Sequence, residues 1–181
     1  MGNGTSNHMM LDQNWAEASN TTIWRNASFS TTIAPHGDHQ GINHVNSEYM
    51  FYAFREIQGF SKVGKYKGSG DADGIFNYCG FKPALVIIKN RDQAEPWVLF
   101  DNNRGSVEGH NVNDEKLTPN TADGENDNSQ TGAHAYNMID FLSNGFKCRS
   151  NNGATNADDK NFLFIAFADK PLVASNGTSP T

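Results

Sequence analysis

Three histidines and an aspartate lie together in the stretch PHGDHQGINH, residues 35–44. His36, His39 and His44 fall within nine residues, beside Asp38. Imidazoles at this spacing can bind a transition metal, and fibrous trimers can gather one histidine from each chain on their axis. No helix or hairpin pattern aims these rings at one another. We therefore predict a polar surface loop whose histidines are candidates for contact with a receptor, and no metal site.

The acidic residues of the region 101–127 suggest two further kinds of chemistry. Oxygen ligands for Ca²⁺ would come from DGENDN, residues 123–128, through Asp123, Glu125 and Asp127. Sugar cleavage would need two carboxyl groups at a defined separation, and the residues available for it are Asp101, Asp114, Glu115, Asp123 and Glu125. Acids in loops rich in Gly and Asn are usually solvated, so we predict neither a metal site nor a catalytic pair here.

A glycine-rich stretch, GSGDADG at residues 68–74, resembles neither a nucleotide loop nor a calcium loop closely enough. Another strand follows it instead of a helix, and Asp71 and Asp73 supply only two of the oxygen ligands that Ca²⁺ requires. We predict a hairpin turn. The two cysteines, Cys79 and Cys148, form no CxxC motif; we expect small buried thiols, with a disulfide between them left open.

Aromatic side chains offer the remaining candidates for recognition. Trp24 and Tyr136 stand in polar stretches and could stack on sugar rings if exposed. Trp97 lies within the apolar run PWVLFDN, so we assign it to the core. Trp24, Tyr136 and the histidines of residues 35–44 are thus the candidate receptor-binding residues.

The chain that must position these groups has 181 residues and a net charge of -6, with 14 basic and 20 acidic residues. Proteins that neutralise phosphates need clustered Lys and Arg, so nucleic acid and anionic membranes are not expected partners. No apolar run is long enough to cross a bilayer. No cofactor motif is present.

Short apolar runs separated by turn residues predict an all-β protein, an antiparallel sandwich or jelly roll. The expected strands lie at residues 61–68, 75–81, 83–90, 96–102, 138–149 (two strands with a turn at Asn144-Gly145) and 161–168. The polar segment from Gly105 to Ala135 is expected to be a long excursion at the edge of the sandwich.

The apolar strand pattern occurs twice. EYMFYAFRE at residues 48–56 matches NFLFIAFAD at residues 161–169 in character, and both are apolar on either face, as in a buried central strand. We infer a repeating unit that ends with this strand. Residues 1–58 would be the second half of one repeat, residues 59–173 a complete sandwich and residues 174–181 a polar tail. A half-repeat ending in such a strand must pack on the complete unit or on another subunit.

The order of motifs in the complete unit resembles an uncharacterised repeat domain of tail-fibre and related structural proteins of marine tailed phages. The motifs that carry the resemblance are YKGSG, GFKPALVIIK, WVLFDN, FLSNGFK and FIAFA, over residues 45–173. The two cysteines depart from its pattern. The resemblance implies a virion structural protein displayed on a tail or capsid fibre, a homo-oligomer such as a trimer, and it carries over no catalytic residue.

From these observations we expect a non-enzymatic fibre or appendage protein of a virion, which works by assembly with itself and other virion proteins and by adhesion to a host-surface glycan or protein. Two alternatives remain open. One is a tail-associated glycan hydrolase that uses the acids of region 101–127. The other is a capsid or fibre decoration protein without a receptor.

Overall fold

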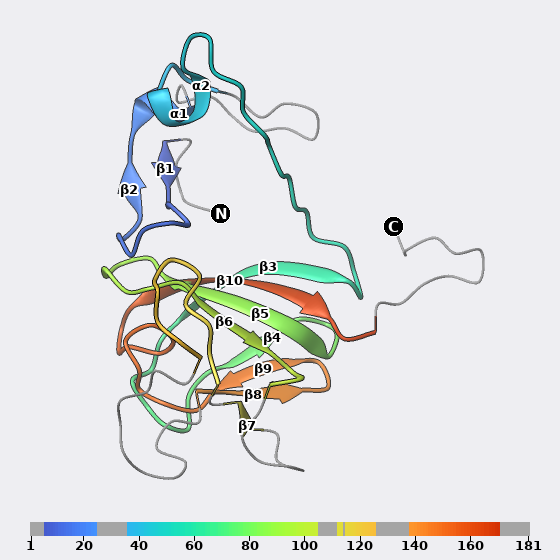
Figure 1. Ribbon diagram of the computed structural model, residues 1–181. Helices are drawn as coiled ribbons and strands as arrows, with labels where there is room; N and C mark the ends of the chain where they lie inside the picture. Colours follow the sequence, from blue (N-terminus) through green and yellow to red (C-terminus); the bar gives the residue numbers. More distant parts are fainter. Residues whose placement is uncertain (1–5, 25–35, 105–111, 114, 126–137, 171–181) are drawn as a thin grey trace, which may run out of the picture.

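The computed structural model describes residues 6–24, 36–104, 112–113, 115–125 and 138–170, which form a β-sandwich and a small N-terminal unit (Figure 1). The first sheet has the order β3-β10-β5-β6 and the second the order β4-β9-β8-β7, and every pairing in both is antiparallel. The predicted all-β antiparallel sandwich is therefore confirmed.

The first sheet comprises β3 (Ser61–Lys67), β5 (Pro83–Asn90), β6 (Val98–Asp101) and β10 (Asn161–Ala168). The second comprises β4 (Phe76–Tyr78), β7 (Val112–Asn113), β8 (Ile139–Leu142) and β9 (Gly145–Cys148). Each predicted strand of residues 61–168 thus has its counterpart. The long excursion supplies β7 at the edge of the second sheet, and its Leu117 bridges Leu99 at the edge of the first.

The core lies between the two sheets and is built from alternate residues of their strands. On β10, Phe162, Phe164 and Ala166 are buried, while the residues between them are half-buried on the outer face. Tyr66 of β3 stacks on Phe162 with ring centroids 4.9 Å apart. The ring of Phe164 lies directly over Gly64, where an added Cβ would stand 2.3 Å from it. The bare backbone of that glycine is what lets the ring reach the core.

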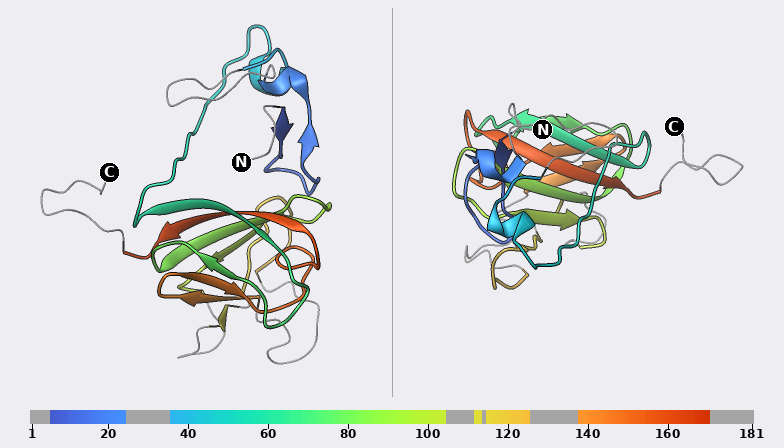
Figure 2. Two further views of the ribbon diagram at one scale, coloured as in Figure 1. Left: turned by 180° about the vertical axis from the view of Figure 1, so that it is seen from behind. Right: turned by 90° about the horizontal axis from the view of Figure 1, so that it is seen from above.

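The N-terminal unit contains β1 (Asn7–His8), β2 (Ala18–Ser19), α1 (Thr21–Trp24) and α2 (Gln40–Asn43). It lies on the outer side of the first sheet (Figure 2). Both helices are single turns, and the described part of the chain contains none that could span a membrane. Residues 12–19 contain a turn and β2.

Three side chains at one end of the first sheet, those of Lys89, Arg91 and Trp97, bind the N-terminal unit. Glu17 accepts from Arg91 Nε at 2.6 Å. Lys89 donates from Nζ to the carbonyls of Asn14 at 3.1 Å and Glu95 at 2.6 Å. Trp97 donates from Nε1 to Met10 O at 2.8 Å. Burial lowers the pKa of Lys89, with Glu95 opposing the shift. A lysine placed there serves as a structural hydrogen-bond donor.

One strand prediction was wrong. Residues 48–56 were expected to form a buried central strand, yet they have no regular secondary structure and are exposed. They run from the N-terminal unit down to β3 as an open strap (Figure 1). We call residues 48–56 the strap. No strand of the described chain pairs with the strap, whereas β10 is paired with β3 on one side and β5 on the other.

Candidate functional site

The structure brings two of the predicted receptor-binding residues together and adds a third ring. Trp24 ends α1, and its Nε1 donates to Asn7 O at 3.2 Å. Its ring lies 6.5 Å from that of His36. His36 in turn meets Phe51 of the strap edge-on, at 5.9 Å and 88°. This cluster is half-buried at Trp24 and exposed at His36 and Phe51, as a surface for stacking on a ligand would be.

The other two histidines are used locally. His39 caps α2, and its Nδ1 accepts from the amide of Gly41 at 3.1 Å. Nδ1 of His44 lies 3.3 Å from Ser47 Oγ. The three histidines therefore do not converge, and the described residues contain no group of three potential metal ligands. Tyr136 lies outside the described residues.

Two of the acids considered for Ca²⁺ or catalysis, Asp101 and Glu125, form ion pairs. Arg104 pairs with Asp101 through Nε and with Glu125 through Nη1 at 2.7 Å. Hydrogen bonds to Glu125 and then Asp101 raise the pKa of Arg104. Asp123 accepts from Thr121 Oγ1 at 2.7 Å. Glu115 is half-buried, and Asp114 and Asp127 lie outside the described residues. A guanidinium shared by two carboxylates is typical of a structural pair.

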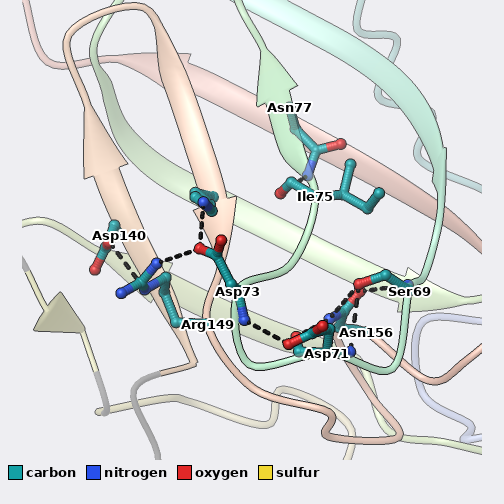
Figure 3. Close-up of polar contacts among 9 residues, drawn as sticks. Ser69, Asp71, Asp73, Ile75, Asn77, Asp140, Arg149 and Asn156 are labelled. Carbon is teal, nitrogen blue, oxygen red and sulfur yellow. Dashed lines mark hydrogen bonds and ion pairs between the residues drawn. The ribbon is translucent and has the colours of Figure 1, made fainter.

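The hairpin turn predicted at residues 68–74 was wrong, because β3 and β4 belong to different sheets and the segment is a crossover loop held by side chains (Figure 3). Asp71 Oδ1 accepts from the amide of Asp73 at 2.9 Å. Asp73 Oδ1 in turn accepts from Lys147 at 2.6 Å and Arg149 at 3.0 Å. The hydrogen bond and charge of Lys147, and then the charge of Arg149, lower the pKa of the Asp73 carboxyl, because both cations favour its ionised form.

Asn156 holds the same loop from within the sandwich. It is completely buried, accepts from the amide of Ser69 at 2.9 Å, and donates to Asp71 O at 2.9 Å and Ser150 O at 2.8 Å. The bonds to Ser69 and Asp71, drawn in Figure 3, set the path of the chain from β3 of the first sheet to β4 of the second. The loop thereby fixes how far apart the two edge strands lie.

An open cleft lies between those edge strands. Its volume is about 590 Å³, and its lining comes from β3, β4 and the core: Lys62, Val63, Gly64, Lys65, Tyr66, Lys67, Ile75, Phe76, Asn77, Tyr78 and Phe164. Phe76 and Tyr78 are 43% and 64% exposed. The cleft thus combines exposed aromatic rings with lysines, although the chain as a whole is acidic. Such a surface suits stacking and acidic groups.

The two cysteines lie near the cleft but do not form a disulfide. Cys79 and Cys148 are free and buried. Burial raises the pKa of each thiol to about 12. Both are therefore protonated at neutral pH, and a thiol rather than a thiolate is a poor nucleophile and a poor metal ligand. The expectation of two small buried thiols is confirmed.

A continuous aliphatic row crosses the outer face of the first sheet. Its members are opposite one another in the strand register, in the order Val63, Ile165, Ile87, Leu99 and Leu117. All five are half-buried rather than buried. The outer face of an isolated sandwich is ordinarily polar, so an aliphatic row across a whole sheet indicates a face that another element covers.

The strap carries a second apolar surface. Its exposed fractions are 48% for Tyr49, 78% for Met50, 59% for Phe51, 73% for Tyr52 and 67% for Phe54. Phe54 touches Phe167 on the outer face of β10, with centroids 6.0 Å apart. These residues form one patch in sequence, and a patch of this kind marks an interaction site.

Sequence reasoning missed the cleft and the outer row as sites. The two-sided apolar pattern of residues 161–168 already signalled the row, since a strand that is apolar on both faces predicts layers on both sides. No sequence pattern predicted the cleft. Its two strands, β3 and β4, are joined by the loop that Asn156 holds, and this contact between distant residues cannot be read from local sequence.

Comparison with known proteins gives one match. The family described as "Domain of unknown function (DUF7483)" matches residues 2–171. Neither the curated proteins nor the solved structures contain a match.

Proposed function

Since the chain belongs to the DUF7483 family, whose description assigns no activity, we propose its function from its own surfaces: it is a non-enzymatic structural protein of a tailed-phage virion. It works in a tail or appendage fibre, by assembly of identical chains and by adhesion to a host-surface glycan or protein. The resemblance of its motifs to phage fibre repeats gives the setting. The surfaces of the fold support the mode of action.

The observation that carries the assembly proposal is the outer row Val63, Ile165, Ile87, Leu99 and Leu117. Covering apolar area stabilises a contact by roughly 25 cal/mol per Å², so an aliphatic row across a flat sheet is a ready interface. In a fibre the covering layer is the corresponding region of a neighbouring chain. This arrangement also accounts for a central strand, β10, that is apolar on both faces.

Adhesion has a separate support in the exposed rings. Trp24, His36 and Phe51 gather at the N-terminal unit, and Phe76 and Tyr78 line the cleft beside lysines. Aromatic faces with polar edges stack on sugars, and lysines favour glycans that carry acidic groups. The hydrolase alternative lacks comparable support, because Asp101 and Glu125 are both bonded to Arg104.

The test of assembly is a charge placed in the row. Sedimentation velocity of the purified chain over a range of concentrations should show an oligomer, and Ile87→Lys should convert it to monomer. Val45→Lys, at a position 78% exposed and distant in sequence from the row, is the matched control and should leave the oligomer intact. Circular dichroism checks that each variant folds. A wild-type chain that stays monomeric at every concentration would contradict the proposal.

The setting is tested on particles. In a virion preparation that contains the chain, gold-labelled antibody should mark fibres or appendages. Labelling tiled over a capsid or tube would favour the decoration protein instead, and absence of the chain from purified particles would remove the virion proposal. Binding of the purified chain to host cells, lost in Trp24→Ala, separates adhesion from assembly.

A further inference from the structure

The strap begins a β-hairpin with β3 and then leaves it. Ile57 and Ser61 form an antiparallel bridge with reciprocal backbone bonds, 3.1 Å from Ile57 N to Ser61 O and 2.9 Å from Ser61 N to Ile57 O. The loop between them has three residues, and Gly59 within it has φ of 73°. A three-residue loop with a left-handed glycine is a standard hairpin connection. The hairpin turn is therefore formed, but Ile57 and Ser61 are the one described pair that is hydrogen-bonded next to it.

The edge of β3 is open along the path that the hairpin would take. β3 is the outermost strand of its sheet. Successive residues of a strand direct their backbone amides and carbonyls to opposite sides, and those of Ser61 face Ile57. The amides and carbonyls of Val63, Lys65 and Lys67 consequently face the same open side. An open edge beside an exposed apolar segment is a site for strand addition.

We propose that this edge and the cleft beside it are a strand-accepting site, and that residues 50–56 of the same chain occupy it. Continuing the register begun at Ile57 and Ser61 places Glu56 opposite Lys62, Phe54 opposite Gly64 and Tyr52 opposite Tyr66. The first sheet then has a fifth strand. This inference concerns a single chain and does not depend on assembly or adhesion.

The alternation of side chains sends the correct residues into the cleft. Opposite residues in an antiparallel pair lie on the same face. Tyr66 is buried in the core and Gly64 lies under Phe164, so both belong to the inner face. Met50, Tyr52 and Phe54 therefore fall on the cleft side in the proposed pairing, and Phe54 must leave its contact with Phe167 on the outer face to reach it. The exposed fractions of these three side chains, 78%, 73% and 67%, are the highest among the large apolar side chains of the strap.

The walls of the cleft complement these side chains. Ile75, Phe76 and Tyr78 line the opposite wall and are 36%, 43% and 64% exposed. The ring of Phe164 covers Gly64 and lines the cleft, so the ring of Phe54 opposite Gly64 would pack beside that ring at the edge of the sheet, as aromatic residues do beside an edge glycine. Closing the strap thus brings two exposed apolar surfaces into contact with each other.

The ion pair at Lys62 and the path of the chain both support pairing of residues 50–56 with β3 of the same chain. Lys62 already pairs with Glu56 at 3.2 Å, as the continued register requires. At the far end, Lys67 and Asn90 lie beside successive residues of β10, Asn161 and Phe162. The N-terminal unit is anchored at that same end through Arg91 and Glu17. A strand that follows β3 from residue 56 to residue 50 therefore arrives where the preceding chain is held.

The test is a cysteine pair at two positions whose side chains lie on the outer face of the sheet. In the proposed register Ala53 is opposite Lys65, within the Cα separation that a disulfide spans. The double variant Ala53→Cys/Lys65→Cys of the full chain is oxidised mildly at low concentration, and the products are mapped by peptide mass spectrometry. The control, Ala53→Cys/Lys67→Cys, moves the partner by two residues on the same face.

We expect the 53–65 disulfide to form within one chain about tenfold faster than the 53–67 disulfide, because only the former meets the geometric requirement. Equal rates for the two pairs, or no disulfide in either, would overturn the proposal. A 53–65 disulfide that joins two chains would overturn occupancy by the same chain and assign the site to a second copy.

Hydrogen exchange on the unmodified chain gives a second measurement. The amides of Val63, Lys65 and Lys67 should exchange slowly if the strand is in place, and Phe54→Asp, which puts a charge into the cleft, should release them. Phe51→Asp, which lies on the outer face, should not. Exchange of these three amides in the unmodified chain at the rate of an unstructured peptide would contradict the proposal.

Discussion

The strap and β10 are two stretches of nearly the same character in opposite environments. Phe164 of β10 is 2% exposed, whereas Phe51, its counterpart in the strap, is 59% exposed. β10 has β3 on one side and β5 on the other, and its inner face meets the second sheet. The strap has one formed pair, at Ile57 and Ser61. An apolar strand pattern thus specifies what a segment can become, and its neighbours decide whether it does.

The largest difference in stability between the two regions is expected when the matched phenylalanines, Phe164 and Phe51, are each replaced by alanine. Phe164→Ala removes a ring that packs against Phe146 and Gly64, and should lower the free energy of unfolding by about 3–5 kcal/mol. Phe51→Ala should change it by less than about 0.5 kcal/mol, as at other surface positions. Urea denaturation measures both. Equal losses would mean that the strap is buried as firmly as β10.

A second test concerns the glycine on which β10 depends. Gly64→Ala would place a Cβ 2.3 Å from the ring of Phe164, so the ring must shift, at a cost of about 1–3 kcal/mol. Gly124→Ala is the control, since a Cβ there meets nothing within 4 Å. Thermal unfolding compares them. If both variants were as stable as the original chain, the close contact between β3 and β10 would be contradicted.

Removing a polar contact should lower the free energy of unfolding more in the sandwich than in the strap. Asn156→Ala leaves buried groups of Ser69, Asp71 and Ser150 without their partner, and should cost about 1–3 kcal/mol. Tyr49→Phe removes the strap's own hydroxyl contacts with His44 and Gln40, which are exposed to water. Its effect should stay within about 0.5 kcal/mol. A larger loss in Tyr49→Phe than in Asn156→Ala would reverse the comparison.

The smallest expected effect is that of Asp73, whose pKa Lys147 and Arg149 lower in the folded chain. A lowered carboxyl pKa contributes stability above the unfolded pKa, and that contribution is lost as the pH falls through the folded pKa. Asp73→Asn should therefore melt at a slightly lower temperature near neutral pH and at the same temperature in acid. Asp71→Asn keeps its acceptor for the Asp73 amide and should show no such pH dependence.

Much of the sandwich was predictable because its strands carry local signals. The expected strands at residues 61–68, 83–90 and 161–168 correspond closely to β3, β5 and β10. Apolar alternation and flanking turn residues are properties of adjacent residues, so they can be read without knowing the fold. The candidate sites were less predictable. Trp24 and His36 meet because α1 and the chain after residue 35 are folded together, and no spacing rule gives that contact.

The sequence by itself determined the class of the fold, the positions of the strands β3–β6 and β8–β10, and the two-sided apolar character of β10 and the strap, because these follow from the types and order of neighbouring residues. Only the tertiary structure decided which of the two apolar stretches is buried, which carboxylates Arg104 and Lys147 neutralise, and that β3 and β4 leave a cleft between them. These outcomes depend on contacts between residues far apart in the chain, whose closure no local pattern encodes.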